Sequence, residues 1–403
     1  MESPPAKRTF TELADIRGQC ADGAEEDDRE LISLLPDELV VRVFSFVDVY
    51  SKLRCEAVSS RFKRCVDAPE AWGCGIFVWR LNSGSHFAIN GTEVTLSKRT
   101  PTLLYLLSRI TPHRLVLCTD ESDTAWTLCS SLTTQRVMFP MERVRLTHFQ
   151  FDCLEDAIIP VASLIIRFNH TLCCVQLTLH AIRDFQNRWK RANLAELWTA
   201  LGTCTRLSSL SFSATDDQQS DAEQVVQTLQ GKPLRALALR GVRALTNEHL
   251  IAICNNLPVG SLASLTVERC DGLVMTLWTP WQLDAKCRSA LRHLRLDVDT
   301  TRDFVLQLGE HFPNLDRCTL ARPFLSTTED TAERPSALHV TRQLLRTFQH
   351  KSFHAQLHID KPGELMLQKV DHEHSADLWD WVSFSENRCR LGLGAAQVEL
   401  LWS

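Results

Sequence analysis

A short apolar motif recurs along the chain: an apolar residue, two others, a second apolar residue, one other, and a third apolar residue. Its clearest copies are Met141/Val144/Leu146, Leu172/Val175/Leu177, Leu207/Leu210/Phe212, Leu234/Leu237/Leu239, Leu262/Leu265/Val267, Leu291/Leu294/Leu296 and Leu315/Cys318/Leu320. Further copies are expected at Leu115/Leu117, Leu357/Ile359 and Val398/Leu400. Successive copies lie roughly 24 to 35 residues apart, a period typical of repeat proteins. The alternation inside each copy predicts one short strand per repeat.

The segments between these strands carry apolar residues at three- and four-residue spacing, which predicts helices. They are LEDAIIPVASLIIRF, NLAELWTALG, DAEQVVQTLQ, TNEHLIAICNNL and TRDFVLQLGEHF. Parallel strands require such crossovers, and one strand-helix unit cannot bury its own apolar face, so the units are expected to stack. Residues 322–336 and 361–373 are expected to be loops or insertions, and HSADLWDWV a helix.

Residues 34–72 have a different pattern, typical of three short helices. Pro36 and the acidic pair after it suit the first turn of a helix. Ser51 is expected to cap a second helix, and SRFKRCV to form a third. Apolar residues surround most of the first helix, namely Leu39, Val40, Val43, Phe44, Phe46 and Val47. A helix with one buried face should carry a single stripe, so this one is expected to need a partner on its second side.

Composition supports a soluble, intracellular chain, either cytoplasmic or nuclear. The formal net charge is −5, which gives no electrostatic reason to expect nucleic-acid binding. No apolar stretch is long enough for a membrane span, and no secretory signal is evident at the N-terminus. The expected organisation is a disordered acidic tail (1–30), the helical motif (31–75), a helical linker or first irregular repeat (76–110) and a repeat array (111–403).

Candidate chemistry is sparse. The 15 cysteines include no C-x-x-C pair, so reduced core thiols are expected rather than zinc ligands or disulfides. Strand alternation would point Cys173 and Cys174 to opposite faces, which argues against a shared metal near His170 and His180. The run 371–374 lacks the helical spacing of a zinc motif. Trp278, Trp281, Trp379 and Trp381 are expected to cap the stack, or alternatively to act as recognition anchors.

LPDELVVRVFSFVDVYSKLRCEAVSSRFKRCVDAPEAW resembles an F-box. The resemblance rests on a leading Leu-Pro pair, Glu38-Leu39, Val43-Phe44 and the later Val58-Ser59, with Arg61-Phe62 and a closing Pro and Trp. It implies binding to a Skp-type adaptor, and through it to a cullin and a RING subunit. The expected adaptor contacts are Leu35, Pro36, Leu39, Val43, Phe44, Val58 and Trp72. Alternatively some of these residues, Val58 above all, only hold the helices together.

Residues 244–273 resemble the cysteine-containing leucine-rich repeat common in F-box proteins, with Cys270 where the chain turns after the strand. The expected fold is therefore α/β: an F-box followed by a curved solenoid with parallel strands inside and helices outside. The resemblance implies the non-catalytic substrate receptor of an SCF-type ubiquitin ligase, with no catalytic residue, cofactor or metal. A scaffold without ubiquitin transfer and an enzyme using Cys and His residues remain the alternatives.

In such a solenoid the residues between the strand leucines would line a concave face. Its candidate substrate-binding residues are Arg143, Arg145, Arg240, His293, Arg295 and Arg317. Guanidinium groups recognise carboxylates and phosphates through paired hydrogen bonds. Alternatively they are ordinary solvated charges, since Glu268 and Asp297 interrupt the patch.

Overall fold

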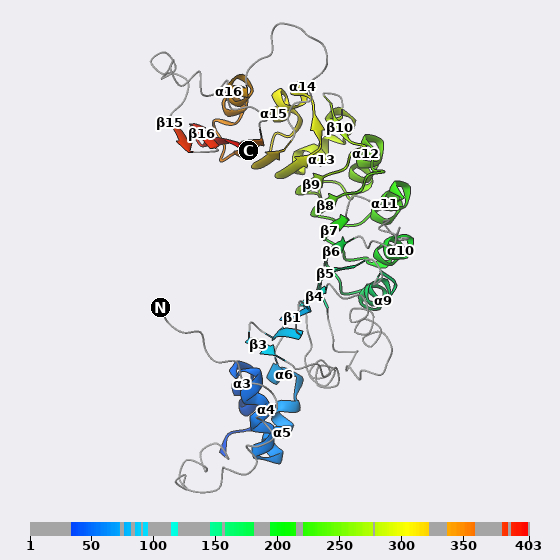
Figure 1. Cartoon of the computed structure of the whole chain (residues 1–403), viewed down its shortest axis with the longest axis vertical. Helices are drawn as coiled ribbons and strands as arrows, with labels where there is room; N and C mark the ends of the chain where they lie inside the picture. Colours follow the sequence, from blue (N-terminus) through cyan, green and yellow to red (C-terminus); the bar gives the residue numbers. More distant parts are fainter. Residues whose placement is uncertain are drawn as a thin grey trace, which may run out of the picture. The chain divides into compact units, whose positions relative to one another are not determined.

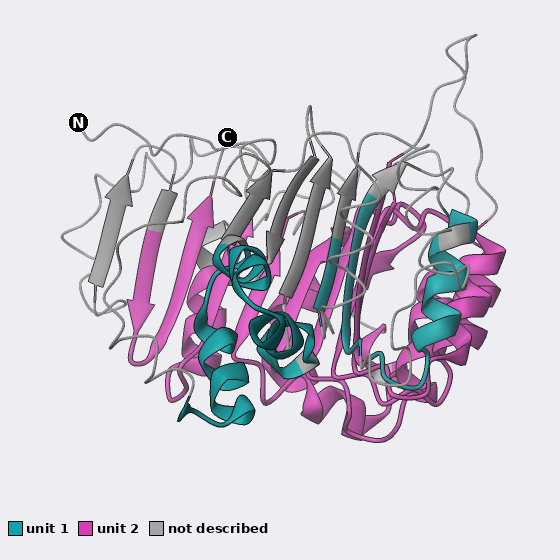
Figure 2. Cartoon of the chain, turned by 90° about the horizontal axis from the view of Figure 1, so that it is seen from below, with its two compact units in different colours: residues 1–172 teal, residues 173–403 magenta. Residues whose placement is uncertain are grey.

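A computed structural model describes residues 34–72, 76–81, 85–89, 92–95, 114–119, 146–154, 158–180, 194–214, 221–276, 279–321, 337–358, 381–385 and 388–401. It divides into two compact units, residues 1–172 and 173–403 (Figure 2). The expected tail at 1–30 and the expected loops at 322–336 and 361–373 lie outside the described residues. So does the run 371–374.

The described part of the first unit begins with four helices, α3 (Asp37–Phe46), α4 (Val49–Val58), α5 (Ser60–Asp67) and α6 (Pro69–Trp72) (Figure 1). Two side chains set the helix boundaries. The Asp48 carboxylate accepts from the Ser51 amide at 3.0 Å, and the Ser59 hydroxyl accepts from the Phe62 amide at 3.1 Å. The cap of α4 is therefore Asp48, not Ser51, and Ser51 supplies the amide that is capped.

The segment after the helices forms strands at 76–81, 85–89 and 92–95, so of the two expectations for 76–110 the helical linker does not hold for these residues, and a first irregular repeat stays a prediction. Strand β1 (Ile76–Leu81) pairs antiparallel with β2 (Ser85–Ile89), and β2 pairs antiparallel with β3 (Thr92–Thr95). Strand β1 also pairs in parallel with β4 (Arg114–Thr119). The sequence between β2 and β3 is Asn90-Gly91, the dipeptide most typical of a two-residue hairpin turn. That signal was available in the sequence and outweighs the helical interpretation.

The first unit ends with β5 (His148–Leu154), which pairs in parallel with β4, and with α9 (Ile158–Phe168). Of the predicted copy Met141/Val144/Leu146 only Leu146 is described, and it lies just before β5. The buried side chains are Leu146, Phe149 and Phe151, which fit the same motif. Arg143 and Arg145, expected on that strand, lie outside the described residues.

The second unit is a largely parallel sheet with helices between its strands. Its strands are β6 (Cys174–His180), β7 (Ser209–Ala214), β8 (Ala236–Arg240), β9 (Ser264–Glu268), β11 (His293–Asp297), β13 (Arg317–Leu320), β14 (His354–His358) and β17 (Ala396–Leu401). Each pairs in parallel with the next in this order. A small second sheet pairs β10 (Val274–Met275) with β12 (Asp299–Thr300).

Helices follow the predicted crossovers. They are α10 (Ala195–Thr203), α11 (Ala222–Leu229), α12 (Asn247–Asn256), α13 (Ala285–Ala290), α14 (Arg302–Leu306), α15 (Leu308–His311) and α16 (Ala337–Phe348), with a 3-10 turn η3 (Pro280–Gln282). The helix predicted over TRDFVLQLGEHF is thus divided in two at Gln307. In Figure 1 helices α10 to α13 lie along one side of the strands from β6 to β11.

Burial alternates along the strands of the second unit. In β7 and β8 the residues Leu210, Phe212, Leu237 and Leu239 are at most 1% exposed, while the residues between them are half-buried. The motif leucines therefore face the helices and form the core, as the sequence predicts. The opposite face of this sheet, turned away from α10 to α13, we call the open face.

Polar side chains join neighbouring strand-helix units. Asn247 donates to the Val274 carbonyl at 2.7 Å, and Asn255 donates to the Gln282 carbonyl at 3.0 Å. The Lys232 ammonium donates to the carbonyls of Gly202 and Cys204, both at 2.9 Å, at the end of α10. Burial lowers the pKa of Lys232. The contacts to Gly202, Cys204 and Gln282 satisfy backbone carbonyls that a helix end would leave unpaired.

The C-terminal end departs from the sequence prediction. Strand β15 (Trp381–Ser385) pairs antiparallel with β16 (Arg388–Leu393), which in turn pairs antiparallel with β17. Trp381 and Val382 therefore belong to a strand, which corrects the end of the helix expected at HSADLWDWV. The expected strand at Val398/Leu400 is confirmed, with both side chains 0% exposed.

Candidate functional site

Helix α3 carries an exposed apolar stripe on its outer side. Leu39, Val43 and Phe46 of the helix are 47%, 54% and 83% exposed, and Leu35, just before the helix, is 38% exposed. We call these four residues the α3 apolar stripe. Leu39, Val43 and Phe46 recur at three- and four-residue spacing, which places them along one side of the helix, and Leu35 precedes its first turn. The other side of the helix is buried in the domain. The two-sided apolar pattern of the sequence is thus resolved into one covered side and one uncovered side.

Two more large apolar side chains near this helix are exposed. Leu34 is 76% exposed and precedes the helix, and Val58 is 70% exposed at the end of α4. Pro36 is also exposed. The alternative in which Val58 only packs the helices together does not fit this exposure.

Phe44 and Trp72 lie in the core instead, so the structure does not offer their side chains as surface contacts. Phe44 is 5% exposed and meets Phe62 edge to face, with ring centroids 5.6 Å apart. Trp72 is 0% exposed and donates from Nε1 to the Val66 carbonyl at 2.7 Å. The expectation that these two contact a partner is corrected by their burial: they hold the helices together.

A cation also lies over the buried indole ring of Trp72. The Lys52 ammonium lies 5.1 Å from the centroid of the Trp72 ring, and Lys52 is only 3% exposed. Burial lowers the pKa of Lys52, and the nearby Asp48 carboxylate opposes that shift. Arg61 ion-pairs with Asp37 at 2.7 Å and also donates to the Leu35 carbonyl. These polar contacts fix the start of α3, which carries the stripe.

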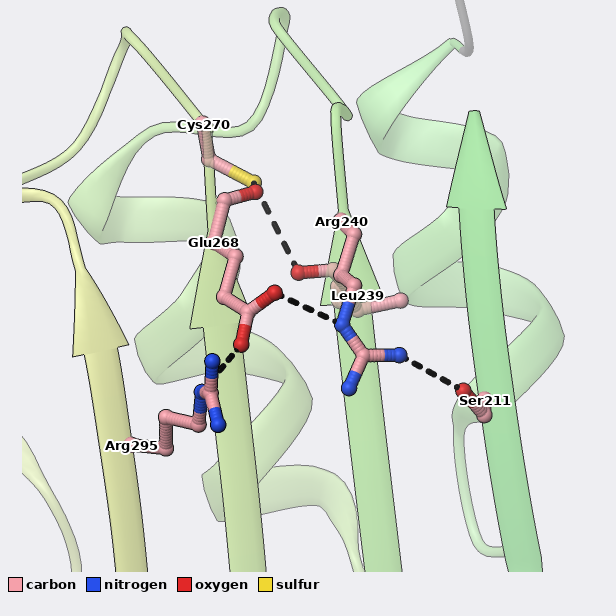
Figure 3. Close-up of polar contacts among 6 residues, drawn as sticks. All are labelled: Ser211, Leu239, Arg240, Glu268, Cys270 and Arg295. Carbon is pink, nitrogen blue, oxygen red and sulfur yellow. Dashed lines mark hydrogen bonds and ion pairs between the residues drawn. The ribbon is translucent and has the colours of Figure 1, made fainter. Parts of the chain in front are cut away.

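The open face of the second unit carries a polar network across four strands (Figure 3). Arg240 donates from Nε to the Glu268 carboxylate at 2.8 Å and from Nη1 to the Ser211 hydroxyl at 3.1 Å. Arg295 ion-pairs with the other oxygen of Glu268. One partly buried carboxylate therefore holds two guanidinium groups from neighbouring strands on either side of it.

Three further side chains lie side by side on this face. The strand register aligns His293 of β11 with Arg317 of β13, and Arg317 with His354 of β14. His293 and Arg317 are exposed and His354 is half-buried. Sequence reasoning proposed His293 and Arg317 for this face but missed His354, because the strand was expected to centre on Leu357/Ile359.

A second acidic group on this face was also missed. Glu399 lies between Val398 and Leu400 and is 5% exposed. It accepts from Arg390 Nε and from Gln356 Nε2, both at 2.9 Å. The alternation of β17 could have revealed it, since a residue between two core positions must face the other side of the sheet.

The cysteines show no clustered chemistry where the structure describes their side chains. All of those are free thiols, and within the described ranges no group of three or more His, Cys, Asp or Glu residues is placed to hold a metal ion. Cys173 and Cys174 are both half-buried, while His170 and His180 are exposed. Cys270 is buried and its thiol lies 3.4 Å from the Glu268 carbonyl oxygen; burial raises its pKa to about 11. A neutral, buried thiol is suited to packing rather than to nucleophilic attack.

The four tryptophans proposed as caps or anchors are only partly described. Trp281 lies in η3 and Trp381 in β15, whereas Trp278 and Trp379 lie outside the described residues. In the part of the chain that the structure covers, no helix is long and apolar enough to cross a membrane.

Comparison with known proteins gives one family match, and it coincides with the helices that carry the stripe. Residues 32–74 match the F-box-like family model. The F-box protein dre-1 of Caenorhabditis elegans is 38% identical over 60 residues, which cover 14% of this chain and 6% of that protein. The N-terminal helical region is therefore F-box-like, and the chain matches only a small part of the length of that relative.

Proposed function

We propose that this chain is the substrate receptor of an SCF-type ubiquitin ligase. The observation that carries the proposal is the α3 apolar stripe, exposed on a helix inside the F-box-like region. F-box domains bind Skp-type adaptors, and the exposed stripe supplies an apolar surface suited to that role. The adaptor would connect the chain to a cullin and a RING subunit.

The energetics favour a partner on the stripe. Burying a Leu, Val or Phe side chain fully is worth about 1.5–3 kcal/mol; three such side chains stand partly exposed on α3, and a fourth, Leu35, just before it. Contiguous apolar surface of this kind marks an interaction site more often than a solvated surface. We propose that Leu35, Pro36, Leu39, Val43 and Val58 contact the adaptor. Phe46 is added to this set because it belongs to the α3 apolar stripe.

The target is proposed to bind the open face of the second unit. We infer that the strand-helix units there are leucine-rich repeats forming a solenoid, because their apolar motif recurs at the required period and their strands are parallel. The exposed side chains between the core positions vary from strand to strand, as a recognition surface requires. The chain would act by proximity, holding a target near a ubiquitin-charged enzyme, with no catalytic group of its own.

Co-expression of the full chain with a Skp-type adaptor, followed by size-exclusion chromatography, tests this function. The variant Leu39→Asp/Val43→Asp should abolish co-elution, because it places two charges in the apolar contact. Ile159→Asp is the matched control, since Ile159 is 59% exposed on α9, outside the F-box-like region. A chain that ignores the adaptor, or a complex that survives the double substitution, would overturn the proposal.

Ubiquitin transfer needs its own measurement. The purified complex with cullin and RING subunit should modify the receptor chain itself when the ubiquitin-charging enzymes and ATP are supplied. An intact complex that binds the adaptor but transfers no ubiquitin would favour the non-catalytic scaffold instead.

A further inference from the structure

The open face carries a compact row of cationic and imidazole groups at its β11–β14 end. His293, Arg317 and His354 occupy the same register position on three successive strands. Neighbouring strands lie about 4.8 Å apart, so the outer two residues are separated by roughly 10 Å at the backbone. Side chains of this length can reach one shared ligand group above Arg317. We call these three residues the β11–β14 row.

The row differs from the other cations of this face in having no counter-charge. Arg240 and Arg295 are held by Glu268, and Arg390 is held by Glu399. Within the described residues, no hydrogen bond or ion pair engages the side chains of the row. The sequence proposed one continuous arginine patch; the structure divides it into arginines already paired and a row whose donors are free.

The acidic groups near the row are engaged by other residues. Glu268 pairs with Arg240 and Arg295, and Asp316, next to Arg317 in the sequence, pairs with Arg292 at 3.8 Å. At the row's own register position the flanking strands carry only uncharged residues, which are Ser209, Ala236 and Ser264 on one side and Gln397 on the other. The row is therefore a localised site for an anion rather than part of a long basic track.

We propose that the β11–β14 row binds a phosphate monoester on the target protein, carried by a phosphoserine or phosphothreonine. This inference rests on the proposed function, because it takes the open face as the target-binding surface. A phosphate monoester presents up to two negative charges and three acceptor oxygens in one compact group. The Arg317 guanidinium offers a planar fork of donors to two of those oxygens, and each flanking imidazole offers a ring N–H.

A phosphate fits this row better than an extended acidic segment does. The unpaired donors span only three strands; elsewhere on the face Arg240 and Arg295 are paired with Glu268 and Arg390 with Glu399, and β11 adds the acidic Asp297. A run of carboxylates would extend past the row onto surface with no free cation. A single dianion concentrates its charge where the free donors are.

Fluorescence anisotropy with the full chain in complex with its adaptor tests the site. The probe is a mixture of labelled peptides with a fixed central phosphothreonine and randomised neighbours, beside matched mixtures with threonine or glutamate at the centre. Wild type should bind the phosphorylated mixture at least tenfold more tightly than the threonine mixture, the order expected for charge-assisted hydrogen bonds. Arg317→Gln should remove about that factor, and Arg317→Lys should restore only part of it.

Arg206→Gln is the matched control, because Arg206 is exposed in the turn after α10 and lies outside the row. Equal binding of the phosphorylated and threonine mixtures, or equal loss in the Arg206 and Arg317 variants, would overturn the proposal. Equal binding of the glutamate mixture would replace the phosphate with an acidic segment. Adaptor co-elution is measured on the same preparations, so failure of the proposed function is seen separately from failure of this site.

Discussion

Arg240 on β8 donates from Nε to the Glu268 carboxylate on β9 at 2.8 Å, across adjacent positions of the parallel register. Arg295 approaches the same carboxylate from β11. Glu268 is only 12% exposed at its side chain, whereas Arg295 is 59% exposed. Arg240, Glu268 and Arg295 thus join strands β8, β9 and β11 on the open face (Figure 3).

Glu268→Gln is expected to lower the free energy of unfolding by about 1–2 kcal/mol. The substitution keeps the side-chain shape but leaves two guanidinium groups facing each other without a counter-charge; the exposure of Arg295 keeps the cost moderate. Chemical denaturation of the second unit measures it. Glu196→Gln, at an exposed position on α10, should change stability by less than about 0.5 kcal/mol. Equal effects of the two substitutions would contradict this role for Glu268.

Truncating the buried Trp72 should destabilise the F-box-like region far more than truncating the exposed Leu39. Trp72 is fully buried and donates to Val66, so its truncation should cost about 3–5 kcal/mol, whereas Leu39→Ala should cost well under 1 kcal/mol. Hydrogen exchange over residues 34–72 is the appropriate measurement, because a chain with two units need not unfold in one step.

For adaptor binding, unlike for stability, the exposed Leu39 side chain should matter. Leu39→Ala should weaken the complex while leaving hydrogen exchange unchanged in the free chain. If Leu39→Ala instead loosened the helices as much as Trp72→Ala does, the stripe would be part of the core.

Cys270 should make stability fall at alkaline pH. Burial raises its pKa to about 11 from the usual 9.0, so the folded chain retains a proton that the unfolded chain loses. The contribution of the protonated Cys270 thiol to the free energy of unfolding is fully present below pH 9 and is lost as the pH rises to 11. The stability difference between wild type and Cys270→Ala should therefore be constant below pH 9.

Above that pH, wild type should lose stability relative to Cys270→Ala. Unfolding by urea at a series of pH values measures both chains under the same conditions, and other titrating groups cancel in the difference. A difference that stays constant up to pH 11 would show that the thiol is not held protonated in the folded chain.

Gly241→Ala should destabilise the chain more than Gly260→Ala. Both glycines have positive φ, +72° and +70°, so both variants carry the same backbone strain. A Cβ at Gly241 would lie 2.1 Å from the Ala214 carbonyl oxygen, whereas at Gly260 no atom lies within 4 Å. The overlap should add about 1–3 kcal/mol, measured as the difference between the two variants in chemical denaturation. Equal losses would mean that the backbone near Ala214 yields without cost.

Much of the second unit could be predicted from local pattern. The motif residues of β7 and β8 are buried as expected, because alternation on a strand fixes which side chains share a face. The prediction did not include β5: Leu146 was taken as the last position of a motif copy, whereas it precedes β5 and the buried Phe149 and Phe151 follow it at the motif spacing. One motif fits several registers when apolar residues are dense, and packing then chooses among them.

The hairpin strands show a different limit. β1, β2 and β3 were not predicted as strands although Asn90-Gly91 separates the last two, and the first two residues of β15 were taken as the end of a helix. Short apolar segments satisfy helical and strand patterns alike, so pairing with a neighbouring strand decides between them. Such pairing depends on residues that are distant in sequence.

The sequence by itself determined the N-terminal helical motif, the F-box resemblance and the strand-helix order, because each depends on residues close together along the chain. It could not say which side of the first helix is covered. Val40 and Phe44 are buried while Leu39 and Val43 are exposed, and only the packing of α3 against its neighbouring helices separates them. Likewise, the arginines of the open face look alike in sequence. The tertiary structure pairs Arg240 and Arg295 with Glu268 and leaves Arg317 between two histidines, because strand register brings together side chains that lie about a repeat apart.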